Sequence, residues 1–430
     1  MPQGTKRVCY PGRSERKGGL VKYVSGLRCR ECGRDYPVAP EHVCEHCFGP
    51  LEVAYDYEAM RAGITREEIE RGPRTMWRYA SLLPAPEDRV VDLAVGFTPL
   101  RLAPRLAAEL GLSKLWLKLD GANPTHSFKD RVVSVAAAAA RSFGYDVLAC
   151  ASTGNLANAM AAHAAASGMR SVAFIPSDLE SGKVAATSIY GGRVVALDGG
   201  YDDVNRLCAE LSGSKQWAFV NVNVRPYYAE GSKSLAFEVA EQLGWRYPDA
   251  VVVPMASGSL FTKMAKGLRE LHRVGLVEAE PRTIIHGAQA EGCSPIAAAF
   301  LAGFEEVRAV KPNTIAKSLA IGNPADGYYA LKEARATGGK IAAVSEASVA
   351  DGVRLLARTE GVFTETAGGV TIATLEHLVR AGSISPNDET VALITGIGLK
   401  TIEAFGDAGP TDSGPPSLDA VERIFEEAPL

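Results

Sequence analysis

VLACASTGNLANAMAAHAAASGMRSVAFI, residues 147–175, contains a complete strand–helix–strand pattern. The apolar run Val147–Ala151 is followed by an alanine-rich segment of helical period, Leu156–Ser167, and then by a second apolar run, Ser171–Ile175. Two short buried strands joined by a crossover helix lie parallel in one sheet. The pattern therefore predicts an α/β fold with a mostly parallel sheet.

The same alternation extends in both directions from about residue 90. It predicts further strands at Lys114–Leu119, Arg193–Leu197, Trp217–Asn221, Val251–Pro254, Thr283–Ala288 and Val391–Thr395. It predicts helices at Asp130–Phe143, Gly182–Tyr190, Asp202–Leu211, Lys233–Leu243 and Phe261–Val274. A chain of 430 residues exceeds the usual size of one hydrophobic core, so we expect two packed domains, or one domain with appendages.

Both ends of the chain differ from this central pattern. The polar segment Asp56–Arg78 predicts a solvated helix. Gly406–Ser417 is rich in Gly, Pro and Ser and predicts a linker, which leads to a short helix at Leu418–Glu427.

Composition excludes several classes of partner. The chain has 46 Lys and Arg against 50 Asp and Glu, a net charge of −4, so nothing favours nucleic acid or an anionic membrane surface. No apolar run approaches the roughly 20 residues that a transmembrane helix needs. Residues 1–25 lack the apolar core of a secretory signal, so we expect a cytoplasmic protein with a small-molecule substrate.

Four of the eight cysteines form two C-x2-C pairs, Cys29/Cys32 and Cys44/Cys47. Four thiolates from two tight turns are the ligand set of a structural, tetrahedral Zn²⁺ site. The spacer between the pairs is slightly short for a zinc ribbon, so His42 and His46 remain possible substitute ligands, and free cysteines packed as small apolar residues are the alternative. A closed site of this kind stabilises structure and takes no part in chemistry. The isolated cysteines are Cys9, Cys150, Cys208 and Cys293.

A lysine stands where the pattern predicts the start of a helix. In NPTHSFKDR, residues 123–131, Ser127 is a good N-cap residue, which places Lys129 in the first turn. The helix dipole, the neighbouring Arg131 and partial burial would each lower the pKa of the Lys129 amine. A lysine with a lowered pKa suits a Schiff-base nucleophile, although pairing with the adjacent Asp130 is an alternative role.

Four ordered blocks resemble threonine synthases, which are fold-type II pyridoxal-phosphate enzymes. These blocks are Asn123–Arg131, Ser152–Asn155 (STGN), Pro254–Thr262 (PMASGSLFT) and Thr395–Lys400 (TGIGLK). Their order and spacing agree with the family from about residue 90 to residue 405, and some members carry a cysteine-bearing N-terminal extension. The resemblance implies that Lys129 binds pyridoxal phosphate as a Schiff base and acts as the catalytic base.

The resemblance also implies roles for the other three blocks. Ser152 and Thr153 would bind the substrate carboxylate at a helix N-terminus, and Asn155 the ring oxygen of the cofactor, whereas a plain helix cap is the simpler explanation of this turn. The hydroxyl of Thr395 would face the pyridine nitrogen. The main-chain amides of one loop would hold the cofactor phosphate: Ala256, Ser257, Gly258, Ser259 and Leu260.

The implied reaction is the β,γ-replacement that converts O-phospho-L-homoserine and water to L-threonine and phosphate, with a carbon–oxygen lyase step. Its substrate carries a phosphate and a carboxylate, so cations are needed near the loops. Arg225 and Lys317 are substrate-binding candidates because they lie near these loops, and Lys183 and Lys233 are further ones; an ordinary surface charge is the alternative role of each.

Two departures from the family pattern bear on substrate choice more than on cofactor binding. His126 replaces a usual glycine, and Ile397 stands where a polar residue is frequent. With these two residues, a cysteate-synthase-like enzyme acting on phosphoserine is the alternative function on the same fold. A non-catalytic zinc-ribbon interaction protein is the alternative from another class, although Lys129, Asn155 and Thr395 are intact.

The resemblance finally implies two doubly wound, mostly parallel-sheet domains with a small N-terminal zinc ribbon, and a homodimer. The N-terminal extension with the cysteine site would span 1–85, and the linker and terminal helix 406–430. The larger, cofactor-binding domain would comprise 86–130 and 225–405, and the smaller domain 131–224.

Overall fold

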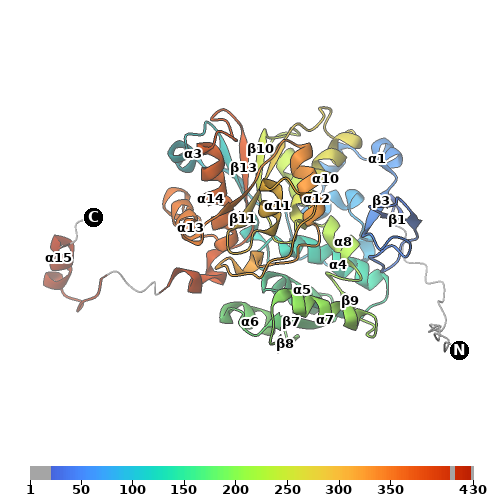
Figure 1. Cartoon of the computed structure of the whole chain (residues 1–430), viewed down its shortest axis with the longest axis horizontal. Helices are drawn as coiled ribbons and strands as arrows, with labels where there is room; N and C mark the ends of the chain where they lie inside the picture. The colour runs from blue at the N-terminus through green and yellow to red at the C-terminus, as the bar shows by residue number, and fades with distance from the viewer. Residues whose placement is uncertain (1–20, 407–411, 428–430) are drawn as a thin grey trace.

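The computed structural model describes residues 21–406 and 412–427. Most of the chain forms two sheets with helices on both faces, and a small antiparallel sheet near the N-terminus packs at one side (Figure 1). The predicted α/β class is confirmed. Cys9 lies outside the described residues, as does part of the predicted linker.

The larger sheet has six strands in the order β12-β11-β10-β13-β5-β4, all parallel except the edge pair β4–β5. The strands are β4 (Leu100–Leu102), β5 (Leu115–Leu119), β10 (Ala250–Pro254), β11 (Ile284–Ala290), β12 (Ile341–Val344) and β13 (Thr390–Ile394). The smaller sheet has four parallel strands in the order β8-β7-β6-β9. They are β6 (Val147–Ala151), β7 (Arg170–Pro176), β8 (Arg193–Leu197) and β9 (Ala218–Phe219).

Strand β10, near the centre of the larger sheet, is apolar throughout because both of its faces are covered. In β10, Val252 packs into the cluster that contains α14 (Thr366–Arg380), whereas Val251 and Val253 pack into the cluster that contains α9 (Lys233–Gln242) and α10 (Ser259–Arg273). All five residues of β10 are buried. A strand buried on both sides shows a continuous apolar run instead of alternation.

The remaining helices except α15 cover the two sheets or follow the N-terminal sheet (Figure 1). Around the smaller sheet lie α4 (Lys129–Ser142), α5 (Asn155–Ala166), α6 (Ser181–Ser188) and α7 (Tyr201–Ser212). The others are α1 (Tyr57–Gly63), α2 (Arg66–Arg71), α3 (Pro104–Leu110), α8 (Arg225–Glu230), α11 (Pro295–Leu301), α12 (Gly327–Ala336), α13 (Glu346–Glu360) and α15 (Leu418–Glu427).

Several predicted boundaries were wrong. The segment Asp56–Arg78 contains two short helices, α1 and α2, whose Met60 and Ile69 are buried. Ser127 does not cap α4, because the helix begins at Lys129 with Phe128 at the N-cap and no side-chain cap bond. Thr395 follows β13 instead of ending it.

Two strands and six helices between residues 100 and 380 were not predicted from the sequence, namely β4, β12, α3, α8 and α11–α14. The terminal helix at Leu418–Glu427 is confirmed as α15.

The N-terminal sheet holds the cysteine pairs. Its three antiparallel strands, β1 (Val24–Cys29), β2 (Asp35–Tyr36) and β3 (Leu51–Tyr55), lie in the order β2-β1-β3. We call residues 24–55 the cysteine ribbon. The two larger sheets take their strands from residues 147–219 and from 100–119 with 250–394. The domain boundaries expected from the sequence remain a prediction.

A buried ion network fixes the start of α4. The guanidinium of Arg131 pairs with Asp120 at 2.7 Å and with Glu238 at 2.5 Å, and Lys118 also pairs with Glu238, at 2.6 Å. Burial alone would raise the pKa of Glu238, but the Arg131 and Lys118 charges outweigh it and lower this pKa to about 2. Removing one partner would leave a buried charge unpaired, which is strongly destabilising.

Candidate active site

A cavity lies between the two large sheets, at the carboxyl ends of β6, β10 and β13. Its wall includes Ser152 after β6, Pro254 at the end of β10 and Thr395 after β13. Loops at the carboxyl ends of parallel strands are the usual place for a ligand in an open α/β sheet. The cavity is therefore the first candidate for the active site.

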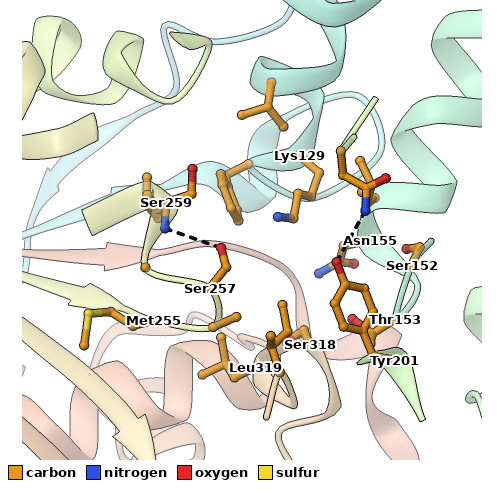
Figure 2. A pocket seen from close by; sticks show the side chains of 18 of the residues that line it. Lys129, Ser152, Thr153, Asn155, Tyr201, Met255, Ser257, Ser259, Ser318 and Leu319 are labelled. Atoms are coloured by element: carbon orange, nitrogen blue, oxygen red, sulfur yellow. Dashed lines mark hydrogen bonds between the residues drawn. The ribbon is translucent and has the colours of Figure 1, made fainter. Parts of the chain in front are cut away.

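Lys129 points into this cavity from the first residue of α4 (Figure 2). Its Nζ donates to the hydroxyl of Tyr228 at 3.2 Å, and the main-chain N–H of its neighbour Phe128 donates to the carbonyl oxygen of Thr395 at 2.9 Å. Burial lowers the pKa of Lys129 to about 8. The lowered pKa increases the fraction of neutral amine near physiological pH, and the neutral amine is the form that acts as a nucleophile or base.

The reasons expected for this shift are only partly correct. Arg131 does not act on Lys129, because its guanidinium faces Asp120 and Glu238 inside the ion network. Asp130 is not a partner of Lys129 either: its Oδ2 accepts from the N–H and the hydroxyl of Thr125, both at 2.9 Å. Burial is the cause that the structure supports.

The side-chain amide of Asn155 has one possible orientation. Lys400 Nζ donates to its Oδ1 at 3.0 Å, and its Nδ2 donates to Glu365 Oε2 at 2.8 Å. An ammonium can only donate and a carboxylate can only accept, so the amide oxygen and nitrogen cannot exchange places. One N–H of Nδ2 remains available for a ligand.

The turn before α5 is both a helix cap and part of the cavity wall. The hydroxyl oxygen of Ser152 accepts from the N–H groups of Gly154 at 3.0 Å and Ala157 at 2.9 Å. Ser152 and Thr153 both line the cavity, on the side opposite the loop that contains Ser257 and Ser259 (Figure 2).

That opposite loop leads into α10, and all five of its predicted residues line the cavity. Gly258 has φ = 88° and is the N-cap of this helix. A Cβ on Gly258 would lie 3.0 Å from the carbonyl oxygen of Asp326, in addition to the strain of the left-handed backbone. The loop thus presents main-chain N–H groups at the start of a fifteen-residue helix, an arrangement that binds phosphate.

Comparison with known proteins identifies the family. Residues 91–396 match the family model described as pyridoxal-phosphate dependent enzyme. This chain belongs to the pyridoxal-phosphate-dependent enzyme family. Within it, the chain is 36% identical to the threonine synthase of Methanocaldococcus jannaschii, over 88% of this chain and 93% of that protein. It is 35% identical to the threonine synthase of Methanosarcina acetivorans, over 94% of this chain and 99% of that protein.

Solved structures of pyridoxal-phosphate enzymes share the fold. An L-serine ammonia-lyase from Rhizomucor miehei superimposes with a TM-score of 0.60 at 23% identity, over 73% of this chain and 98% of that one. Diaminopropionate ammonia lyase from Escherichia coli gives a TM-score of 0.63 at 17% identity, over 73% of this chain and 87% of the other. These likenesses support the fold.

The cavity fits the cofactor of this family. Lys129 is a buried amine with a lowered pKa, the Gly258 turn leaves no room for a side chain, and α10 begins at the loop. The free N–H of Asn155 and the Thr395 position, 2% exposed, complete a set of groups suited to a phosphorylated pyridine aldehyde. Pyridoxal phosphate is therefore the resident cofactor.

Of the four candidate cations, Arg225 alone lines the cavity among the described residues. Lys183 is fully buried and pairs with Glu180 at 3.0 Å, and Lys233 pairs with Glu230 and Glu270 away from the cavity. Lys317 pairs with Asp178 at 3.5 Å, although the adjacent Ser318 lines the cavity. Lys183 and Lys233 therefore have structural partners.

The two departures from the family pattern lie outside the cavity wall. His126 takes the left-handed backbone that suits the usual glycine, with φ = 61°, and it is exposed. The Cγ2 of Ile397 lies against Gly121. Neither residue lines the cavity, so neither provides an argument for a different substrate.

The cysteine ribbon brings its four predicted thiols together. The sulfur atoms of Cys29, Cys32, Cys44 and Cys47 lie within 4.8 Å of one another. Neither His42 nor His46 belongs to this cluster. The group can hold a metal ion with thiolates alone.

Sequence reasoning missed the polar residues that come from outside the four blocks. Glu365 precedes α14, Tyr228 lies in α8, and Tyr201 and Asn221 line the wall around Asn155 (Figure 2 labels Tyr201). Lys400 ends the fourth block, but its pairing with Asn155 was not expected. None of these residues follows a local pattern that distinguishes it from a surface residue.

In the described ranges, the helices are all too short or too polar to cross a membrane.

Proposed function

We propose that this chain is a threonine synthase that converts O-phospho-L-homoserine and water to L-threonine and phosphate. One observation carries the proposal: Lys129, an amine with a pKa of about 8, faces a cavity between two helix N-termini in a chain 36% identical to an archaeal threonine synthase. The N-terminus of α5 suits the carboxylate of the substrate, and the N-terminus of α10 suits the phosphate of the cofactor.

The cofactor would be held by groups on three elements. Lys129 would bind its aldehyde carbon, the loop from Ala256 to Leu260 its phosphate, and Asn155 and Thr395 its ring. Pyridoxal phosphate supplies an electron sink that stabilises negative charge on carbons near the substrate amino group.

The chain's own residues would then move protons. As a free amine, Lys129 would take protons from Cα and Cβ of the substrate and return protons to Cα and to Cγ, because Cγ becomes a methyl group once the phosphate has left. Tyr228 holds its Nζ in place by accepting its hydrogen bond at 3.2 Å. The positive charge of Arg225 would bind the γ-phosphate of the substrate, and water would add at Cβ after this phosphate has left Cγ.

Ser152 and Thr153 would bind the substrate carboxylate at the start of α5, and Lys317 would approach the phosphate if its surface pair with Asp178 opened. A Zn²⁺ ion on the four ribbon thiolates would stabilise structure only. We further propose that the protein is a cytoplasmic homodimer. Its structural units would be the N-terminal extension 1–85, the larger domain 86–130 with 225–405, the smaller domain 131–224, and the linker and terminal helix 406–430.

The function is tested by assaying phosphate release from O-phospho-L-homoserine and from phosphoserine, with threonine identified as the product. Turnover of phosphohomoserine with threonine formation is the expected result. Preference for phosphoserine would replace the proposal with the cysteate-synthase-like alternative. A chain that binds no pyridoxal phosphate would favour the interaction protein.

A further inference from the structure

A buried carboxylate connects the cysteine ribbon to the cavity wall. Asp326 immediately precedes α12 and is 5% exposed. Its Oδ2 lies 2.6 Å from Nη2 of Arg225, which lines the cavity, and its Oδ1 lies 3.4 Å from Nη1 of Arg30 in the ribbon. Its main-chain N–H donates to the carbonyl oxygen of Ser257 at 2.9 Å. One residue thus touches the ribbon, α8 and the proposed phosphate loop.

The ribbon side of this connection comes from within a C-x2-C pair. Arg30 and Glu31 are the two residues between Cys29 and Cys32. The guanidinium of Arg30 lies 3.5 Å from the ring centre of Tyr329, and the Tyr329 hydroxyl donates to Glu31. Arg30 and Glu31 therefore both contact Tyr329, which lies in the first turn of α12 close to Asp326.

A second set of contacts reaches the helix that carries Arg225. The Tyr227 hydroxyl donates to the carbonyl oxygen of Ala39 at 2.9 Å, and the Tyr55 hydroxyl donates to Glu230 at 2.8 Å. Ala39 and Tyr55 belong to the ribbon, whereas Arg225 and Tyr228 of the same six-residue helix line the cavity. Helix α8 therefore has the ribbon on one side and the active site on the other.

We propose that Asp326 is a positioning residue for Arg225, and that Arg30 shares its carboxylate so that the ribbon sets the affinity of the cavity for the substrate phosphate. The proposal rests on the proposed function, in which Arg225 binds that phosphate. An arginine held through Nη2 presents its remaining N–H groups in one orientation, so less side-chain entropy is lost when an anion binds. Arg30 restrains the carboxylate from its other oxygen.

We call the link from Arg30 through Asp326 to Arg225 the relay. Three substitutions in the holoenzyme test it. Asp326→Asn keeps the shape and removes the charge, and we expect the KM for phosphohomoserine to rise about tenfold with kcat within about twofold. Arg30→Gln should raise KM about threefold, and Arg30→Lys should restore part of this loss because it keeps the charge. Arg28→Gln is the matched control, since Arg28 pairs only with the exposed Asp35 of the same ribbon.

The double variant provides the sharper measurement. Because Arg30 acts through Asp326, adding Arg30→Gln to Asp326→Asn should raise KM little further. Metal content and the visible absorbance of the cofactor should match the parent in every variant, whereas a merely structural role would lower kcat and melting temperature together. Should Asp326→Asn fail to fold, Arg30→Gln decides, because Arg30 is partly exposed.

The relay is wrong if Arg30→Gln has the KM of Arg28→Gln, or if the two effects multiply fully in the double variant. Failure of the proposed function is a separate result, seen as a parent enzyme that releases no phosphate from phosphohomoserine. In that case the affinity of the holoenzyme for inorganic phosphate, measured by calorimetry, replaces KM. The relay then predicts that the variants rank by their affinity for inorganic phosphate in the same order as expected for KM. Equal affinities for all of the variants would overturn the relay.

Discussion

Lys400 donates to the amide oxygen of Asn155 at 3.0 Å, and this contact decides which way the Asn155 amide faces. Glu365 accepts from the amide nitrogen on the opposite side at 2.8 Å. Burial lowers the pKa of Lys400 to about 8, with the Glu365 charge opposing that shift. A cation and an anion thus hold a neutral amide with one N–H free toward the cavity.

The first prediction follows from this contact. Lys400→Met should raise the dissociation constant of pyridoxal phosphate about tenfold, because Asn155 loses the donor that fixes its amide. Titration of the apoprotein with the cofactor measures this effect. Lys311→Met, at an exposed position, is the control and should bind normally. Equal affinities for the two variants would show that the amide orients without Lys400.

Lys129→Ala should abolish turnover and the visible absorbance of bound cofactor while the protein stays folded. The side chain is buried with a lowered pKa, so its removal takes away a group whose charged form burial disfavours. Circular dichroism and thermal unfolding provide the folding control. Turnover at the parent rate would end the mechanism proposed here.

The capture of pyridoxal phosphate by the apoprotein should depend on pH. Only the neutral amine of Lys129 attacks the cofactor aldehyde, and burial lowers its pKa from 10.5 to about 8. The association rate should therefore rise with pH and level off above about 8. Stopped-flow absorbance measures this rate, and the profile should persist in Lys400→Met. A midpoint near the ordinary lysine pKa would contradict the burial argument.

The cysteine ribbon should bind one zinc ion per chain. Cys29→Ser or Cys44→Ser should lose the metal and lower the unfolding temperature, while the cofactor spectrum is retained because the thiols lie outside the cavity. Metal analysis after aerobic and anaerobic purification is the measurement. Cys208→Ser, a buried cysteine remote from the cluster, should keep the zinc. Metal-free parent protein would indicate four free thiols.

Thr395 should act on the cofactor. Thr395→Ala removes one neutral hydrogen bond, a loss of roughly 0.5–1.5 kcal/mol, and should weaken cofactor binding and slow proton abstraction together. Thr395→Asp would place a carboxylate at the ring nitrogen and encourage side reactions such as transamination. Cofactor dissociation constants and product distributions test both. Normal binding and a parental rate of threonine formation in both variants would make Thr395 only a structural residue.

Local patterns were sufficient for much of the fold. The run Val147–Ala151 predicted β6, because a fully buried strand shows a short continuous apolar run. The segment Leu156–Ser167 predicted α5, because its apolar residues recur with the period of a helix. The C-x2-C pairs predicted their cluster because each pair lies in one turn. Lys129 was placed in a first helical turn for a similar reason, although the cap residue was wrong.

Contacts between distant segments were decided by the tertiary structure. Lys183 and Arg225 are both cations near predicted loops, yet Arg225 lines the cavity and Lys183 is paired with Glu180. Glu365 reaches Asn155 across 210 positions of sequence. No local period records such a contact, because it depends on which strand ends the two sheets bring together.

The amino-acid order therefore determined many of the elements, the place of Lys129 at the start of a helix and the thiol cluster, since hydrophobic period, turn residues and short spacings act within a few residues. The packing of the sheets decided the direction of Arg131, the clamp on Asn155 and the link from Arg30 through Asp326 to Arg225. Burial and charge pairing between remote segments arise only when the chain is folded, because each group's energy depends on neighbours that the sequence places far away.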